Sequence, residues 1–158
     1  KREAITEMIA ELCVSGVNAI VKSEERLQQI RSLFDLDGIT VFSDRGNRLV
    51  CRNGNYMAEA PDGRLGFEDE RYLSLFGDDD IFVESNMLRL RSQIPAAYAV
   101  TQEQEVGAAL QCLSRKEGIP YTMVSFEVFN RNRKWSDKDV TLLTLLGHCI
   151  GDLLNYSE

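Results

Sequence analysis

The chain has 158 residues, of which 44% are apolar and 27% are charged, and these proportions are ordinary for one globular domain. Its formal net charge of −7 at pH 7 repels phosphate backbones, so we expect no nucleic-acid partner. No apolar run approaches the roughly 20 residues of a membrane-spanning helix, and the N-terminus has no signal-peptide core. We therefore expect a single cytoplasmic domain over residues 1–158, without direct membrane insertion. Because the sequence begins with Lys1 and not with Met, we expect it to be part of a longer chain.

Two helices are expected first. Apolar or small residues recur at spacings of three and four, which predicts a helix leading into the domain over residues 1–22. A second helix is expected after a break near Lys22, with Ser23 as its N-cap. Its buried face would carry Leu27, Ile30 and Phe34.

A hairpin and an irregular segment follow. β-branched and aromatic residues predict antiparallel strands over residues 39–43 and 48–53. Glycine, proline and asparagine punctuate residues 54–80. Within that segment, a short helix over residues 68–76 is expected to bury Tyr72, Leu73 and Phe76.

The chain then returns to regular structure. A short strand is predicted over residues 81–84, and an extended segment bearing Arg89 and Arg91 after it. Pro95 is expected to open a helix over residues 95–104.

The last third has the clearest pattern. Strands are predicted over residues 107–113 and 120–129, with a turn over residues 115–118 between them. In the second strand, alternate side chains point to opposite faces. One face carries Val124, Phe126 and Val128, and the other carries Met123, Ser125 and Glu127.

A final helix is predicted over residues 136–156, with Ser136 as its cap. It carries two apolar stripes, and a helix that rests only on a sheet needs one. We expect a sheet on one side and a second helix on the other, formed by residues 3–20 of this chain or of a symmetry mate. This order of elements predicts an α+β domain with helices outside an antiparallel sheet.

The segment from Gly107 to Leu113, the Lys116-Glu117-Gly118 turn, the strand from Thr122 to Glu127 and the Arg133-Lys134-Trp135-Ser136 connection together resemble the C-terminal half of a GAF domain. The resemblance is strongest to GAF domains that precede diguanylate cyclase (GGDEF) modules. It implies an antiparallel sheet of five or six strands in a GAF-like, PAS-like fold. The terminal helices would cover one face and an irregular lid the other.

The resemblance also implies a function. The domain would be a regulatory, small-molecule-sensing or dimerisation module of a bacterial signal-transduction protein, and no enzyme by itself. It would form a parallel homodimer through its terminal helices and control a covalently linked output domain that makes cyclic-di-GMP or acts as a kinase. The alternatives are a GAF-fold enzyme such as a free methionine sulfoxide reductase, and a scaffold with no ligand.

Eight side chains are candidates to line a ligand pocket between the lid and the sheet, and the ligand or cofactor itself is left open. They combine apolar surface with few polar anchors, as small-molecule sites do. The alternative is that they fill the core of the lid, with Arg89 at an exposed rim beside Arg91. The candidates are Phe67, Tyr72, Phe76, Met87, Arg89, Met123, Ser125 and Glu127.

No catalytic or metal-binding residue is predicted, and the remaining reactive side chains have simple interpretations. His148 is expected at the surface or at an interface, and Asp78-Asp79-Asp80 as a solvated turn. Trp135 is expected to pack the last hairpin onto the final helix. The four cysteines are expected to be reduced thiols.

Among these thiols, Cys112 is expected to be buried and inert. A reductase would instead need Cys51 and Cys112 to approach each other. Some GAF relatives attach bilin through a cysteine beside a histidine. The only such pair here, His148-Cys149, lies in the final helix, so we expect no bilin attachment.

Overall fold

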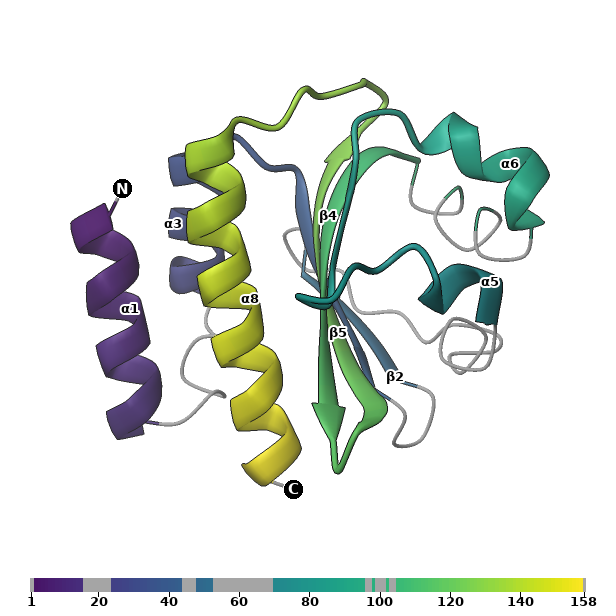
Figure 1. Ribbon diagram of the computed structural model, residues 1–158. Helices are drawn as coiled ribbons and strands as arrows, with labels where there is room; N and C mark the ends of the chain where they lie inside the picture. Colours follow the sequence, from purple (N-terminus) through teal and green to yellow (C-terminus); the bar gives the residue numbers. More distant parts are fainter. Residues whose placement is uncertain are drawn as a thin grey trace.

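The computed structural model describes residues 2–15, 24–43, 48–52, 70–95, 98, 102 and 105–157. Their centre is a five-stranded antiparallel sheet with the strand order β2-β1-β5-β4-β3 (Figure 1). This confirms the predicted α+β architecture. The strands are β1 (Gly38–Ser43), β2 (Arg48–Arg52), β3 (Ile81–Glu84), β4 (Val106–Lys116) and β5 (Ile119–Phe129).

Helices cover both faces of the sheet (Figure 1). We call the face covered by α1, α3 and α8 the helix face. The short helices α5, η2 and α6 together form what we call the lid, and the face that they cover is the lid face. Within the described residues, no helix is both long enough and apolar enough to cross a bilayer. The helices are α1 (Arg2–Ser15), α3 (Glu24–Phe34), α5 (Glu70–Leu73), η2 (Met87–Arg89), α6 (Leu90–Gln93) and α8 (Asp137–Ser157), where η2 is a 3-10 helix.

The β4–β5 hairpin is longer, and its turn tighter, than the sequence pattern predicts. Lys116 pairs with Ile119, which leaves a turn of two residues, Glu117 and Gly118. Both have positive φ, at 54° and 80°. A two-residue turn of this kind matches the twist of the strands that it joins, so the pairing continues to the tip.

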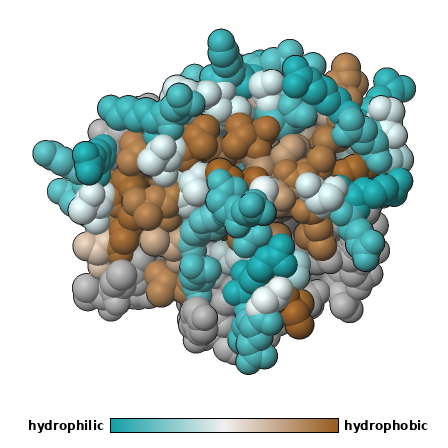
Figure 2. Space-filling model, viewed as in Figure 1, coloured by the Kyte–Doolittle hydropathy of each residue, from teal (hydrophilic) through white to brown (hydrophobic). Residues whose placement is uncertain are grey.

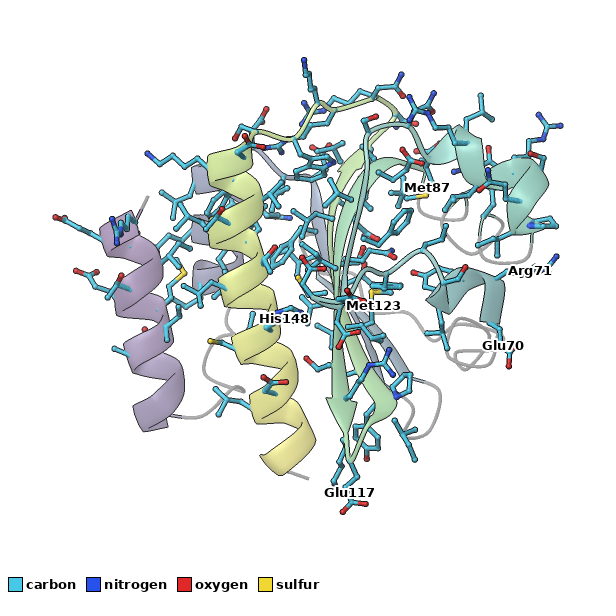
Figure 3. All side chains as sticks on the ribbon, in the orientation of Figure 1. Glu70, Arg71, Met87, Glu117, Met123 and His148 are labelled. Carbon is cyan, nitrogen blue, oxygen red and sulfur yellow. The ribbon has the colours of Figure 1, made fainter. Side chains whose placement is uncertain are left out.

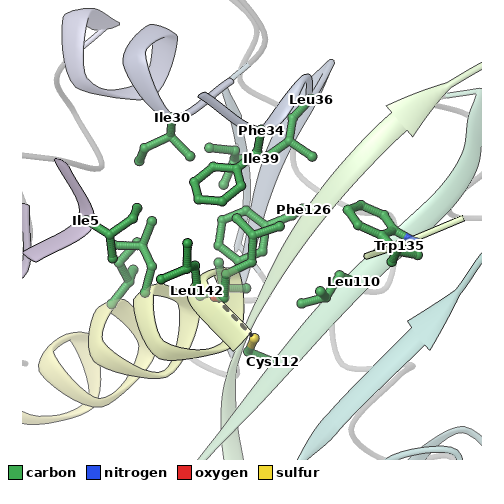
Figure 4. Packing of buried hydrophobic residues seen from close by; sticks show 14 of the residues in the cluster. Ile5, Ile30, Phe34, Leu36, Ile39, Leu110, Cys112, Phe126, Trp135 and Leu142 are labelled. Atoms are coloured by element: carbon green, nitrogen blue, oxygen red, sulfur yellow. Dashed lines mark hydrogen bonds between the residues drawn. The ribbon is translucent and has the colours of Figure 1, made fainter. Parts of the chain in front are cut away.

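The helix-face core forms where α8 lies against β4 and β5 (Figure 4). Phe126 and Leu143 are completely buried there, and the Cys112 thiol lies 3.9 Å from the Leu143 carbonyl oxygen. Two glycines one helical turn apart, Gly147 and Gly151, face this part of the sheet. A Cβ on Gly147 would lie 2.6 Å from the Cys112 Sγ, so the absence of a side chain lets the helix approach the strands this closely.

The second apolar side of α8 packs against α1 of the same chain. Ile5 and Met8 of α1 are each 1% exposed. An ion pair of 2.6 Å between Arg26 and Glu11 ties α3 to α1. The second helix that the two stripes predict is therefore supplied within the chain, and a symmetry mate is not needed to cover that stripe.

The segment bearing Arg89 and Arg91 is not extended, which corrects the sequence prediction. Arg89 belongs to η2 and Arg91 to α6. Asn86 starts the turn, because its Oδ1 accepts a hydrogen bond of 3.1 Å from the Leu88 N–H. This side-chain cap satisfies a free donor at the beginning of a short helix and favours helical backbone over a strand.

Other elements differ from the predictions mainly in length. The helix expected over residues 68–76 is α5, four residues long, with Tyr72 buried and Leu73 half-buried, and the buried Phe76 follows it outside the helix. Ser136 caps α8 as predicted, since its Oγ accepts a hydrogen bond of 3.2 Å from the Asp139 N–H.

Some predictions fall outside the described residues. They are the break near Lys22 with the Ser23 cap, most of the irregular segment including Phe67, most of the helix expected over residues 95–104, and the side chains of Cys13, Leu27 and Cys51.

The close approach of α8 predicts the effect of Gly147→Ala. In an exposed helix this change would stabilise by about 0.5–1 kcal/mol. Here the new methyl group would lie 2.6 Å from the Cys112 Sγ and 3.0 Å from the Phe126 ring. We expect a net loss of about 1–3 kcal/mol in the free energy of unfolding, measured with urea.

The matched control is the same substitution in a Cys112→Ala background, where the sulfur is gone. The loss should then be smaller than in the parent chain. Equal losses in both backgrounds would contradict the contact as its cause.

Candidate functional site

The lid face of the sheet carries a second apolar cluster. Tyr72, Phe76 and Phe82 form a run of tilted aromatic contacts, with ring centroids 5.5 Å and 5.9 Å apart. Figure 3 shows Met87 and Met123 on this side of the sheet. The buried members of the cluster are Tyr72, Phe76, Phe82, Met87, Leu90, Ile94, Val106, Ala109, Leu113 and Met123.

A row of buried polar side chains crosses the sheet beside this cluster. Thr40 of β1 and Gln111 of β4 both pair with Ser125 of β5, so register places the three side by side on one face. Glu127 follows two residues after Ser125, and Tyr72 reaches the row from α5. All five are between 0% and 6% exposed.

Hydrogen bonds connect the row from end to end. The Tyr72 hydroxyl donates to the Gln111 Oε1, and the Gln111 Nε2 donates to the Ser125 Oγ at 3.2 Å. The Ser125 hydroxyl donates to the Glu127 Oε2 at 3.0 Å, and the Thr40 hydroxyl donates to the Glu127 Oε1 at 2.6 Å. Every donor therefore points toward the Glu127 carboxylate, which accepts at both oxygens.

Burial perturbs the two acidic groups at the ends of the row. It raises the pKa of the Glu127 carboxyl to about 7, and the bonds from Thr40 and Ser125 oppose this rise. Burial, with the nearby Glu127 charge, also raises the pKa of the Tyr72 hydroxyl, which keeps its proton to donate. Within the described part of the chain, no lysine, arginine or histidine nitrogen lies within 4.0 Å of the Glu127 carboxylate.

The structure brings together six of the eight predicted pocket residues. Tyr72, Ser125 and Glu127 belong to the polar row, and the three others lie in the apolar cluster. Arg89 is not among them: its side chain is 66% exposed at the rim of the lid, 3.8 Å from the Glu84 carboxylate.

Sequence reasoning missed Thr40 and Gln111. Each lies in a predicted strand, but its neighbour across the sheet is known only from the register. A polar residue at an inward position of an otherwise apolar strand was the available signal for both.

The connection between β5 and α8, residues 130–136, is tied to the end of β3 next to the lid. The Trp135 Nε1 donates to the Glu84 carbonyl oxygen at 3.1 Å, and the Arg133 N–H donates to the Ser85 carbonyl oxygen at 3.0 Å. The next residue, Asn86, caps η2. Trp135 thus joins the helix-face core, as predicted, and also contacts the strand that leads into the lid.

The Arg133 side chain extends this junction to α8 and α3. Its Nη2 lies 3.2 Å from the Asp139 Oδ2 in the first turn of α8, and its Nη1 donates to the Asp35 carbonyl oxygen at 2.9 Å. The guanidinium stacks over the Trp135 ring at 4.3 Å. We call Arg133, Trp135 and Asp139 the lid–α8 junction.

The cysteine placement argues against the reductase alternative. Cys112 is fully buried on the helix face, and burial together with Asp79 raises the pKa of its thiol to about 12. Cys51 lies in β2, which β1 and β5 separate from β4. At about 4.8 Å per strand, the two backbones are about 14 Å apart, so Cys51 and Cys112 do not approach each other as a reductase would need.

The other polar candidates lie on or near the opposite side of the sheet. His148 is half-buried on α8, with its Nε2 3.4 Å from the Asp80 carbonyl oxygen. Asp78 and Asp79 are exposed in a turn, and Asp80 pairs with Arg115 at 3.1 Å. Among the described residues, no three His, Cys, Asp or Glu side chains converge as metal ligands.

Two hollows at the surface lie away from the polar row. One of about 370 Å³ adjoins the C-terminal end of α3, and one of about 420 Å³ lies between η2 and the start of the β5–α8 connection. Their linings share no residue with the row, so the row is not part of either hollow.

Comparison with known proteins gives the fold. No protein-family model matches the chain, and no curated protein sequence matches it. The GAF domain of an Acinetobacter phosphoenolpyruvate-protein phosphotransferase is 11% identical, with a TM-score of 0.60 over 98% of this chain and 92% of that one. The PixJ GAF domain of Thermosynechococcus elongatus in its blue-light-absorbing form is 13% identical, with a TM-score of 0.60 over 89% and 86%.

A larger neighbour shares the same architecture. The chromophore-binding domain of a Stigmatella aurantiaca bacteriophytochrome is 13% identical, with a TM-score of 0.66 over 98% of this chain and 59% of that one. The chain has the GAF fold, as the resemblance implied.

The thiol environment predicts slow modification of Cys112. With burial and a pKa of about 12, the reactive thiolate is scarce and shielded. We expect N-ethylmaleimide to label Cys112 in the folded protein at least about 100-fold more slowly than in urea, by peptide mass spectrometry. Equally fast labelling would restore the enzyme alternative.

The buried carboxyl predicts a dependence of stability on pH. Between pH 4.5 and about 7, folded Glu127 holds a proton that the unfolded chain has lost. The free energy of unfolding therefore falls as pH rises through this window, by up to about 3 kcal/mol. Glu127→Gln cannot ionise, so the variant's stability relative to the parent should increase from pH 4.5 to pH 7.5 in urea titrations. A difference that stays constant with pH would show that the carboxyl is not perturbed.

Proposed function

We propose that this chain is a cytoplasmic regulatory domain of a bacterial signal-transduction protein that binds a small molecule on the lid face. The bound state would be passed through α8 to a covalently linked output domain that makes cyclic-di-GMP or acts as a kinase. The domain itself would carry out no reaction. The GAF fold supports the proposal, since fold neighbours include a bacteriophytochrome's chromophore-binding domain and a phosphotransferase's GAF domain.

One observation carries the proposal: a carboxylate with a raised pKa ends a buried polar row next to an apolar lid. Burying Glu127 costs free energy unless it is compensated, and two hydroxyl donors compensate only partly. A domain that needed only a core would be more stable with an apolar residue there. Perturbed titratable groups of this kind cluster at binding sites.

The lid–α8 junction supplies a route from that site to the output. Glu84 at the end of β3 receives the Trp135 N–H, and two residues later Asn86 begins the lid helices. From Trp135, the stacked Arg133 reaches Asp139 in the first turn of α8. A displacement of the lid would therefore move the N-terminal end of the helix that leaves the domain.

A parallel homodimer through the terminal helices remains part of the proposal. Because α1 covers one stripe of α8, the partner would contact the outer surface of the two helices. Leu145 of α8 is 51% exposed. Figure 2 shows apolar side chains gathered along α8 on this face of the molecule.

Native mass spectrometry tests the proposal directly. The chain expressed in a bacterial host should carry a non-covalent small molecule that is lost on unfolding and refolding. Its loss should speed amide hydrogen exchange in residues 84–94 and in the first two turns of α8.

The matched variant is Trp135→Phe, which keeps an aromatic ring, smaller than the indole, but removes the N–H donor. In this variant, ligand loss should still speed exchange in the lid but no longer in α8. A chain that carries no small molecule, with identical exchange before and after refolding, would support the ligand-free scaffold instead.

A further inference from the structure

We infer that the ligand of the lid face is an organic cation with a flat apolar body, such as an amidinium, and that Glu127 holds its charged end. The inference rests on the proposed function and adds the chemical class of the ligand. Three features of the described residues support it: the direction of the hydrogen bonds, the sign of the charge and the nature of the apolar surface.

The directions of the hydrogen bonds determine which groups of a ligand can bind to the row. The three hydroxyl protons and one of the two Gln111 amide protons already point to the next acceptor toward Glu127. A carboxylate has about four acceptor positions, and Thr40 and Ser125 use two of them. A ligand that binds the remaining acceptor positions of Glu127 must therefore bring N–H or O–H donors of its own.

The charge favours a cation among such donors. Glu127 is 2% exposed, and no cationic side chain in the described part of the chain offsets it. A cationic ligand would remove the cost of burying that carboxylate, whereas an anion would add to it. The formal net charge of −7 also attracts cations to the whole domain.

The surface beside the carboxylate suits a flat apolar body. The rings of Tyr72 and Phe76 and the thioether of Met123 lie in the cluster that borders the row. Aromatic faces attract cations, and methionine side chains adapt their shape to flat groups. A compact, fully hydrated cation such as ammonium would use none of this surface.

Three probes of nearly equal shape test which ligand charge the site prefers. They are benzamidine, which is a cation at neutral pH, benzamide, which is neutral, and benzoate, which is an anion. Calorimetry and NMR on the refolded, ligand-free chain should detect benzamidinium bound at the lid face. The shifted resonances should include Ser125 and the Met123 methyl group. Benzamide should bind more weakly, and benzoate should not bind.

Two variants test whether benzamidinium binds to Glu127. Glu127→Gln should weaken benzamidinium at least about tenfold, the loss expected for one buried charged hydrogen bond. Glu117→Gln removes the same charge at the exposed hairpin tip, as Figure 3 shows, and should leave the affinity unchanged.

A measurement on the parent chain covers the case in which Glu127→Gln does not fold. Because a cation stabilises the ionised carboxylate, benzamidinium should release protons on binding near pH 7 and bind more tightly at pH 8 than at pH 5.5. Buffers with different ionisation enthalpies measure that release in the calorimeter.

Stronger binding of benzoate, no binding of any probe, or no proton release would overturn the inference. The proposed function is judged separately. An anion found by native mass spectrometry would leave the sensor role intact and refute only the ligand class. The absence of both a co-purified molecule and probe binding would refute both.

Discussion

The close contact of α8 with β4 and β5 sets the geometry on which the rest of the structure depends. Because Gly147 and Gly151 carry no side chain, the helix backbone lies directly against Cys112 and Ser114. That distance allows α8 to be covered by α1 on its other side and to begin beside the end of β3. α8 is therefore packed against the sheet on one side and against α1 on the other.

The lid face differs from the helix face in its buried polar side chains. Its apolar cluster contains aromatic, methionine and aliphatic side chains, and a polar row with a buried acid runs beside it. Stability alone would favour apolar residues at Thr40, Ser125 and Glu127. The retention of a costly buried acid on the lid face is the main reason to propose a function for that face.

Sequence patterns predicted the parts that depend on local periodicity. The alternation in β5 correctly placed Phe126 and Glu127 on opposite faces, and Ser136 correctly marked the start of α8. Features that depend on register or strand order were not predictable in this way. Cys51 is kept apart from Cys112 because two strands intervene, and the row from Thr40 to Gln111 exists only through cross-strand pairing.

The Gln111 amide sets the direction of the hydrogen bonds along the polar row. Its oxygen faces Tyr72 and its nitrogen faces Ser125, so protons along the row are ordered in one direction. Hydroxyl groups can reorient by rotating a single O–H bond, but the amide must turn by half a revolution to exchange its two ends. Reversing the hydrogen bonds between the phenol of α5 and the carboxylate of β5 would therefore require this one buried amide to rotate.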